Sequence, residues 1–381
     1  MTQATAVPLD KKYLESISKG LDAAFKRADK EPFDPNKERI VIFSDHHKGV
    51  GDPADDFRRC EHAYTSALGY YREAEYKLFV LGDGEELWEE HAGDVIKRYR
   101  DVLQLEAEFV RPKNGLSRFY GNHDDQWKSQ KQVSKHLSGL FGDDIKVREA
   151  LRLTVDRPGK EPGTLFFVHG HQGTADSDRF GFASRLFVRH VWRPLQRKTG
   201  YTATTPARDF ALRAKHDRAM YEWAARQPGG FVMIAGHTHR PVFSKCVPDP
   251  PPTRPITDLE EALDQASDDR AAAAAIRAEL EYARTGVRRP DEVLTVPAPC
   301  YFNTGCCSFP DGDITGLEIA DGQVRLVRWP GNLREIRAAE VGVDPAKRIL
   351  ETEDLEKVFA AVSAELPADA AVVEREIRPR S

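Results

Sequence analysis

The chain has 381 residues, a length that favours one large domain with insertions, or two domains. It is 40% hydrophobic and 31% charged, which excludes a wholly disordered or collagen-like chain and indicates a globular protein. The 56 Lys and Arg residues nearly balance the 61 Asp and Glu residues. We therefore expect no overall charge that attracts nucleic acid or an anionic membrane.

The cysteine content and the hydropathy of the chain indicate a compartment. There are five cysteines, an odd number without the CxxC spacing of a metal site, which suggests reduced thiols: Cys60, Cys246, Cys300, Cys306 and Cys307. The first residues contain no apolar targeting segment, and the chain contains no uncharged apolar run of about 18 residues. We expect a cytoplasmic protein that does not span a membrane.

The first segment of the chain predicts a helical arm. Residues 10–29 carry Leu14, Ile17, Leu21 and Phe25 at three- and four-residue steps, which is typical of an amphipathic helix packed on a larger body. Two prolines and several turn formers over 31–37 predict a loop before the first strand. We therefore expect an N-terminal helical arm over residues 1–38.

A pattern that recurs from Arg39 onward predicts the core. Short apolar runs are each followed by a polar cluster: IVIF before SDHHKG, KLFVL before GDGEE, SRFY before GNHDD, TLFFV before HGHQG, and FVMIA before GHTHRP. Such runs are typical of buried strands. Helix-length segments over 58–75 and 87–110 lie between them, so we expect an α/β layered fold. Sheets of this kind bind ligands just beyond the carboxyl ends of their strands.

Two segments interrupt this core. Residues 177–198 carry arginines at four-residue steps, including Arg185 and Arg189, and form a candidate cap. Residues 247–295 contain a proline-rich loop and an alanine-rich helix, and are interpreted as a helical insertion. The core that carries the five polar clusters is expected over 39–246 and 296–330. Three further strands of a meander are predicted there, over 301–305, 316–320 and 323–329. A C-terminal helical tail is predicted over 331–381.

Histidines and carboxylates are concentrated in the polar clusters. The clusters contain His46, His47, His123, His169, His171, His237 and His239, with Asp45, Asp83, Asn122 and Asp124 beside them. Imidazole and carboxylate ligands together favour Mn²⁺, Fe²⁺ or Zn²⁺ over Ca²⁺, and there are enough of them for two ions. Two such ions suit the hydrolysis of a phosphoester. Asp83 is the natural bridge, because a carboxylate offers two oxygens.

The five clusters, in this order, resemble the motifs of the calcineurin-like metallophosphoesterases. The motifs are DHH (45–47), GDGEE (82–86), GNHDD (121–125), HGH (169–171) and GHTH (236–239). The resemblance implies an α/β (α+β) fold, a four-layer αββα sandwich with helical insertions, and two divalent metal ions: Mn²⁺, Fe²⁺ or Zn²⁺. It also implies a hydrolase that acts on phosphoester bonds.

The resemblance implies a role for each motif residue. One ion would be held by Asp45, His47 and His239, and the other by Asn122, His169 and His237, with Asp83 between them. His123 would contact the phosphate and protonate the leaving oxygen, and Asp124 would orient it. His171 would face the substrate, whereas His46 would be structural. Glu86 would orient neighbouring groups, or would be a solvated charge at the start of a helix.

The segment after HGH is similar to that of the UDP-2,3-diacylglucosamine pyrophosphatases, in which an arginine-bearing helical segment follows a metal histidine. Arg185 and Arg189 would then bind a second phosphate, or else form a solvated face. We expect a small phosphorylated substrate, such as a nucleotide or a sugar diphosphate.

The expected reaction is hydrolysis of a phosphomonoester, a phosphodiester or a pyrophosphate by direct attack of a metal-bridging hydroxide. Two alternatives are a non-catalytic scaffold on the same fold and a DNA-processing nuclease. The balanced charge disfavours a nucleic-acid partner. The sequence leaves the oligomeric state open.

Overall fold

The computed structural model describes residues 11–110, 115–174, 210–243, 299–331 and 347–364, and the single position 263. The candidate cap over 177–198, which contains Arg185 and Arg189, lies outside the described residues. The helical insertion predicted over 247–295 also lies outside them, apart from position 263.

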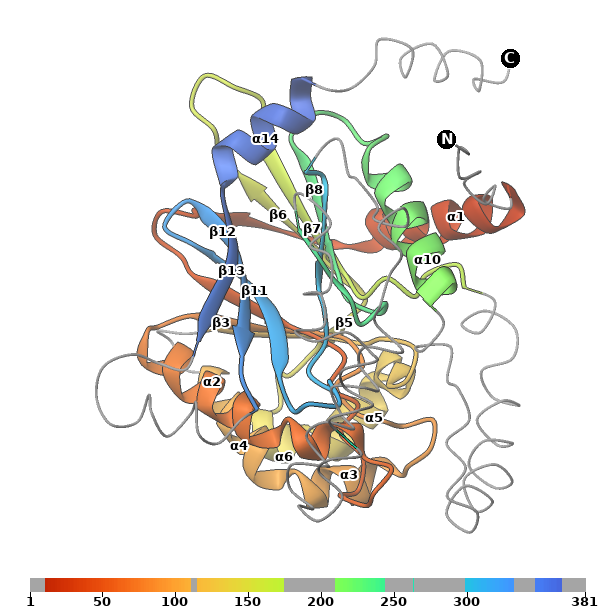
Figure 1. The fold of residues 1–381 in the computed structure, drawn as a ribbon. Helices are drawn as coiled ribbons and strands as arrows, with labels where there is room; N and C mark the ends of the chain where they lie inside the picture. Colours follow the sequence, from red (N-terminus) through yellow and green to blue (C-terminus); the bar gives the residue numbers. More distant parts are fainter. Residues whose placement is uncertain are drawn as a thin grey trace.

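A seven-stranded sheet forms one half of the core (Figure 1). Its order is β13-β12-β11-β2-β3-β4-β5, with the bounds β2 (Ile40–Phe43), β3 (Lys77–Leu81), β4 (Gly115–Phe119), β5 (Val147–Arg148), β11 (Ile314–Ala320), β12 (Gln323–Trp329) and β13 (Arg348–Asp354). Strands β2 to β5 are parallel, whereas β11 to β13 pair in antiparallel fashion. The carboxyl ends of β2, β3 and β4 therefore lie at one edge of the sheet.

A six-stranded sheet forms the other half. Its order is β1-β6-β7-β8-β10-β9, with the bounds β1 (Asp29–Phe33), β6 (Ala150–Val155), β7 (Gly163–Val168), β8 (Phe231–Ala235), β9 (Pro241–Val242) and β10 (Tyr301–Thr304). Strands β7, β8 and β10 run parallel to one another. Their carboxyl ends also meet at a common edge.

The central strands are apolar along their whole length because both of their faces are buried. In β2, Ile40 and Ile42 point into a cluster shared by the two sheets, whereas Val41 and Phe43 point into a cluster beneath the helices. Strand β7 behaves in the same way, since Phe167 belongs to the shared cluster. The two sheets thus pack face to face, with helices on both outer faces (Figure 1).

Helices cover both outer faces of the paired sheets. The seven-stranded sheet is covered by α2 (Glu61–Glu73), α3 (Ala92–Arg98), α4 (Arg100–Ala107), α5 (Gln130–His136) and α6 (Ser138–Phe141), with short 3₁₀ turns at Asp56–Arg59, Glu108–Val110 and Asp125–Lys128. The six-stranded sheet is covered by α1 (Lys11–Arg27) and α10 (Phe210–Ala224). Helix α14 (Leu355–Ala364) closes one end of the shared cluster. This αββα arrangement confirms the predicted fold class.

Three elements differ from the sequence-based expectation. The predicted loop over 31–37 begins inside β1, which pairs in parallel with β6. The three strands predicted as one meander are divided between the sheets, because β10 pairs with β8 while β11 pairs with β2 and β12. The predicted helical tail contains β13, an edge strand with an exposed face. These differences arise from pairing partners that lie far away in the sequence.

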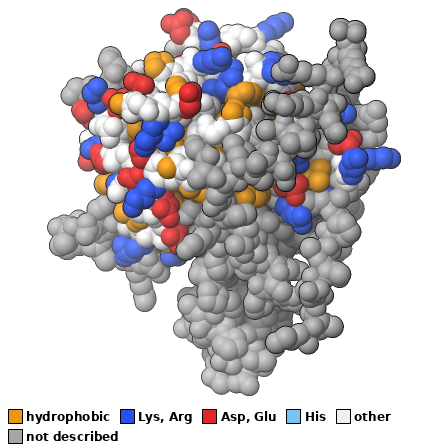
Figure 2. Space-filling model, turned by 90° about the horizontal axis from the view of Figure 1, so that it is seen from above, with side chains coloured by type: hydrophobic (Ala, Val, Ile, Leu, Met, Phe, Trp, Pro, Cys, Tyr) orange, Lys and Arg blue, Asp and Glu red, His pale blue; other side chains and the backbone are white. Residues whose placement is uncertain are grey.

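The described surface carries both signs of charge. On the face drawn in Figure 2, basic and acidic side chains lie interspersed over the described part of the chain. This mixture agrees with the nearly balanced charge of the sequence. Among the described residues, no helix combines the length and the apolar character needed to cross a membrane.

The shared cluster between the sheets should contribute strongly to stability. Phe167 is fully buried there, and its ring packs against that of Phe79 with the centroids 5.1 Å apart. We expect Phe167→Ala to lower the free energy of unfolding by about 3–5 kcal/mol, because it leaves a cavity. The control Ile349→Ala, at a side chain that is 53% exposed, should change it by less than about 0.5 kcal/mol. Urea unfolding followed by circular dichroism measures both, and equal losses would contradict the prediction.

Candidate metal centre

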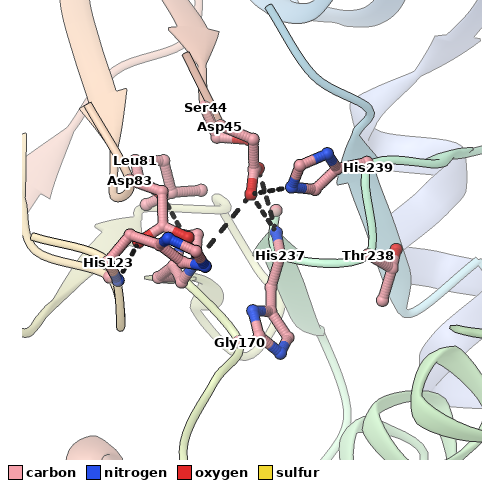
Figure 3. A network of polar contacts seen from close by, with 12 residues as sticks. Ser44, Asp45, Leu81, Asp83, His123, Gly170, His237, Thr238 and His239 are labelled. Atoms are coloured by element: carbon pink, nitrogen blue, oxygen red, sulfur yellow. Dashed lines mark hydrogen bonds and ion pairs between the residues drawn. The ribbon is translucent and has the colours of Figure 1, made fainter. Parts of the chain in front are cut away.

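The predicted site residues meet at the carboxyl ends of the strands. Asp45 and His47 follow β2, Asp83 follows β3, and His237 and His239 follow β8. Figure 3 shows Asp45, Asp83, His237 and His239 converging from loops that belong to both sheets. The contact between the sheets is direct, because the backbone N–H of His237 donates to Asp45 Oδ2 at 2.9 Å. The site therefore forms only when the two sheets are packed together.

The backbone at the site is left-handed. Seven described residues other than glycine have positive φ, and five of them are predicted metal ligands: Asp45 (54°), His47 (52°), Asp83 (49°), His237 (71°) and His239 (55°). Non-glycine residues rarely adopt this conformation, and it concentrates at functional sites. Tertiary hydrogen bonds hold it here, including Asp45 N–H to the Gly82 carbonyl at 3.1 Å and His47 N–H to the Asp83 carbonyl at 3.0 Å.

Two glycines of the motifs allow the loops to approach closely. A Cβ atom at Gly121 would lie 2.1 Å from Asp83 Oδ1, and one at Gly236 would lie 2.3 Å from Ser44 Oγ. Both contacts are far shorter than van der Waals separation. A side chain at either position would therefore push Asp83 or the Ser44–Asp45 turn out of place.

Asp45, His47 and His239 form the first ligand group. One donor atom from each lies within 4.8 Å of the other two. His239 Nε2 lies 3.2 Å from Asp45 Oδ1, and His47 Nε2 lies 3.1 Å from His239 Nε2. Asp45 and His47 are buried and His239 is partly buried. One carboxylate with two imidazoles matches the donor set that Zn²⁺, Mn²⁺ or Fe²⁺ accepts.

Asp83, His169 and His237 form the second ligand group. His169 Nε2 lies 3.1 Å from Asp83 Oδ2, and His169 Nδ1 donates to the Leu81 carbonyl at 2.8 Å. That bond places the proton on Nδ1, so a lone pair on Nε2 is available to a metal ion. Asn122 Oδ1 is buried and has no hydrogen-bond partner, as expected of an oxygen that awaits a ligand.

The two groups are adjacent. His47 Nε2 lies 3.8 Å from Asp83 Oδ2, and His169 Nε2 lies 3.9 Å from Asp45 Oδ1. Each carboxylate is therefore within 4 Å of a histidine of the other group. Asp83 Oδ2 thus lies within 4 Å of a histidine of each group, and the donor set fits divalent metal ions.

The electrostatics of the metal-free chain show how strongly the site favours positive charge. Burial lowers the pKa of His47, but the Glu86 hydrogen bond and the charges of Asp83 and Asp45 outweigh burial and raise it to about 10. For His169, burial is likewise outweighed by the Asp83 and Asp45 charges, and its pKa rises to about 9. Burial raises the pKa of Asp83, but the nearby histidines lower it well below its ordinary value.

His123 lies outside both groups, joins His47 and Glu86 in a third candidate group, and is held by two neighbours. Its Nδ1 lies 2.7 Å from Glu86 Oε2, and the same oxygen lies 3.0 Å from His47 Nδ1. The indole of Trp88 stacks on the His123 ring with the centroids 4.3 Å apart and the planes 19° apart. When both Nδ1 atoms donate to Glu86, each ring keeps its Nε2 atom for a ligand or a substrate.

Glu86 contacts the rings of both His123 and His47, as the orienting interpretation predicts, and its side chain is only 13% exposed. Glu86 lies in the loop between β3 and α3, six residues before α3 begins. Asp124 differs from expectation. Its carboxylate accepts the Gly121 N–H at 2.6 Å and the Gly84 N–H at 2.8 Å, and Glu86 rather than Asp124 pairs with the ring of His123. Asp124 thus ties the loops after β3 and β4 together.

Two further histidines of the motifs are buried. His46 packs against Tyr64 with the ring centroids 4.5 Å apart, and neither of its nitrogens has a hydrogen-bond partner. It faces the helical layer and belongs to neither ligand group. His171 is only 3% exposed, its Nδ1 has no hydrogen-bond partner, and its ring lies 5.5 Å from that of His169.

A buried charge network, formed by Lys48, Glu85, Glu106 and Arg118, lies beneath these loops. Lys48 Nζ donates to Glu106 at 2.8 Å, Arg118 Nη2 donates to Glu85 at 2.6 Å, and Arg118 also pairs with Glu106. All four residues are at most 1% exposed. Because Lys48 and Glu85 also form a backbone bridge, the network connects the loops after β2 and β3. The sequence analysis did not identify it, since charged residues are rarely fully buried.

Comparisons with known proteins were made for the whole chain. No protein-family model matches it, and no curated protein sequence matches it. Among solved structures, it is similar to a conserved uncharacterized protein from Streptococcus pneumoniae described as a predicted phosphoesterase, at 10% identity and a TM-score of 0.26, over 77% of this chain and 90% of that one. It is also similar to a dimetal phosphatase from Danio rerio, at 11% identity and a TM-score of 0.30, over 77% and 96%.

Metal uptake should release protons. At pH 7.5, below the pKa values of about 10 for His47 and about 9 for His169, both rings carry an extra proton in the metal-free chain. A metal ion needs the lone pair on each Nε2, so we expect about two protons to leave on saturation with Zn²⁺. Affinity should fall as the pH is lowered from 8 to 6. Calorimetric titration in buffers of different ionisation enthalpy measures the release, and identical heats in all buffers would contradict it.

Proposed function

We propose that this protein is a metal-dependent phosphoesterase. The observation that carries the proposal is the placement of two adjacent ligand groups with His123, which belongs to neither of them, beside them. The first group supplies Asp45, His47 and His239, and the second supplies Asp83, His169 and His237. Asn122 supplies a further buried oxygen without a partner. His123 lies within hydrogen-bond reach of Glu86 and outside the two groups.

Two divalent ions held by these residues would supply positive charge to the phosphate oxygens and would lower the pKa of a water molecule at the reacting centre. The chain's own residues do the rest. The backbone N–H of His123 donates to Asp83 Oδ1 at 2.8 Å and keeps the second oxygen of Asp83 directed at His169. The loops after β3 and β4 are thus fixed relative to each other.

His123 has the properties of a general acid. Burial lowers its pKa, but the charges of Glu86 and Asp83 outweigh burial and raise it above the ordinary value. The protonated form of the ring, which a general acid needs, is therefore favoured relative to a free imidazole. Because Glu86 accepts from Nδ1 and Trp88 covers one face, Nε2 is the atom that can donate to the departing oxygen.

The proposed substrate class includes three kinds of phosphate ester or anhydride. A phosphomonoester, a phosphodiester or a pyrophosphate would each place negative oxygens on the two ions. Arg185, Arg189 and His171 remain proposed contacts for a second phosphate or for the rest of the substrate. Screening nucleotides, sugar diphosphates and phosphoproteins against the Mn²⁺-loaded protein would identify the class. Bound metal without turnover on any of them would favour a scaffold, and cleavage of DNA alone would favour a nuclease.

Replacing His123 tests the proposed acid. We expect His123→Ala to lower kcat by about 10²–10⁴-fold on a phosphoester with a poor leaving group, because the departing oxygen then lacks its proton donor. The loss should be smaller on p-nitrophenyl phosphate, whose leaving group needs less help. Metal content measured by mass spectrometry should stay at the wild-type value.

Two control variants accompany this measurement. Asp83→Asn should lose metal and activity together, since it weakens the carboxylate between the two groups. His136→Ala changes a histidine of α5 that belongs to neither group, and its turnover should match the wild type. Wild-type turnover in His123→Ala would refute the role given to His123.

A further inference from the structure

Two consecutive residues of α10 hold the middle residues of both His-x-His segments. His216 Nε2 lies 2.7 Å from the carbonyl oxygen of Gly170, which separates His169 from His171. Asp217 Oδ1 accepts the hydroxyl of Thr238 at 2.9 Å, and Thr238 separates His237 from His239. Figure 3 shows Gly170 and Thr238 beside the converging site side chains. Neither contact follows from the sequence motifs.

The bond from His216 defines its tautomer. A carbonyl oxygen only accepts, so Nε2 carries the proton and Nδ1 is left to accept. The hydroxyl of Tyr13 on α1 lies 2.7 Å from Nδ1 and fills that need. His216 is 4% exposed, and both of its nitrogens are thus paired. The result is a chain of two hydrogen bonds, from Tyr13 through His216 to Gly170.

Gly170 is a position where such a bond affects the site. Its φ is +112°, which lies outside the regions open to other residues, and a Cβ there would contact Met220 Sδ at 3.0 Å. The ring of His216 also packs edge-on against that of His237 with the centroids 5.0 Å apart. His216 thus contacts the loops of both histidine pairs.

Asp217 performs the matching task for the second loop. Its Oδ1 also accepts the hydroxyl of Tyr301 at 2.8 Å, and Asn303 Nδ2 donates to the Gly236 carbonyl at 2.6 Å. Asp217 is fully buried. Successive side chains on a helix point about 100° apart, so one turn of α10 reaches the loops after both β7 and β8.

Helix α1 packs against α10 and against the loop that follows His171. Trp223 Nε1 of α10 donates to Asp22 of α1 at 2.9 Å, and Ser16 Oγ donates to the Gly173 carbonyl at 2.7 Å. The two backbones touch, because a Cβ at Gly20 would lie 2.5 Å from Gly173 N. The N-terminal helix, expected as an arm beside the core, is packed directly against the loop that follows His171.

We propose that α10, held in place by α1, positions the two histidine-bearing loops of the metal centre. His216, Asp217 and Tyr13 are the positioning residues. The inference rests on the proposed function, because it assigns these residues a task toward the same ions. Buried polar contacts of this kind add little net stability, about 1 kcal/mol each, but they specify geometry. Partners that orient metal-binding side chains typically change metal affinity by about 10–100-fold.

The test compares four variants of the full chain. His216→Leu removes both polar atoms at similar volume, His216→Gln keeps an N–H near the position of Nε2, and Tyr13→Phe removes one hydroxyl. Tyr71→Phe is the matched control, because it removes a buried hydroxyl that donates to Glu318 at 2.7 Å in the seven-stranded sheet. Zn²⁺ dissociation constants come from competition with a chromophoric chelator, and thermal unfolding gives the stability of each variant.

We expect His216→Leu to weaken the binding of at least one Zn²⁺ ion by about 10–100-fold, and Tyr13→Phe to weaken it by less. His216→Gln should stay within about threefold of the wild type, and Tyr71→Phe should keep wild-type affinity despite its loss of stability. Wild-type affinity in both Tyr13→Phe and His216→Leu would overturn the inference. So would an equal loss of affinity in Tyr71→Phe. If His216→Leu does not fold, Tyr13→Phe against Tyr71→Phe decides.

A second measurement separates this inference from the proposed function. Amide hydrogen exchange over residues 169–174 and 236–239 of the metal-free protein should be about tenfold faster in His216→Leu than in the wild type, with β11 and β12 unchanged. Unchanged exchange in the two loops would overturn the inference. A wild-type protein that binds no Zn²⁺ would refute the proposed function, while faster loop exchange in the variant would still support α10 as the positioning element.

Discussion

The structure depends on the left-handed residues that end its central strands. Asp45, Asp83 and His237 lie two residues beyond the ends of β2, β3 and β8, and their left-handed backbone turns the chain sharply. Their side chains therefore point toward one another and do not continue along the sheet. Such a conformation costs about 1–3 kcal/mol per residue and persists only where the surroundings determine it. Here the surroundings come from both sheets, since His237 donates to Asp45 across their junction. The site is therefore a product of the whole fold.

Charge balance is the second constraint. Asp45 and Asp83 are almost fully buried, and two carboxylates so close together need positive charge nearby. In the metal-free chain protonated histidines supply it: despite burial, the pKa of His169 is raised by the charges of Asp83 and Asp45, and that of His47 by the Glu86 hydrogen bond together with those charges. Divalent ions would take over that charge. The same residues would thus serve as counter-ions without metal and as ligands with it.

The sequence predicts those parts of the fold and site that are local along the chain. A buried strand and the polar turn behind it are neighbours in sequence, so the five clusters and their common edge could be inferred together. Glu86 could be proposed but not separated from a helix-start charge, because the difference lies in which side chains reach it. His216 and Asp217 carry no local signal, since their importance comes from Gly170 and Thr238 in distant loops. Strand β13 was missed for a similar reason, because its exposed, charged sequence pairs only through β12.

The buried charge network limits how the chain can change over evolutionary time. Its two positive and two negative groups cancel, so losing Arg118 or Glu106 alone would leave an uncompensated charge in a dry interior. That loss typically costs about 3–5 kcal/mol, whereas replacing a whole set with apolar residues can be neutral. Single substitutions within this network are therefore strongly destabilising. Descendants of this chain should either retain all four residues or differ at several of them at once.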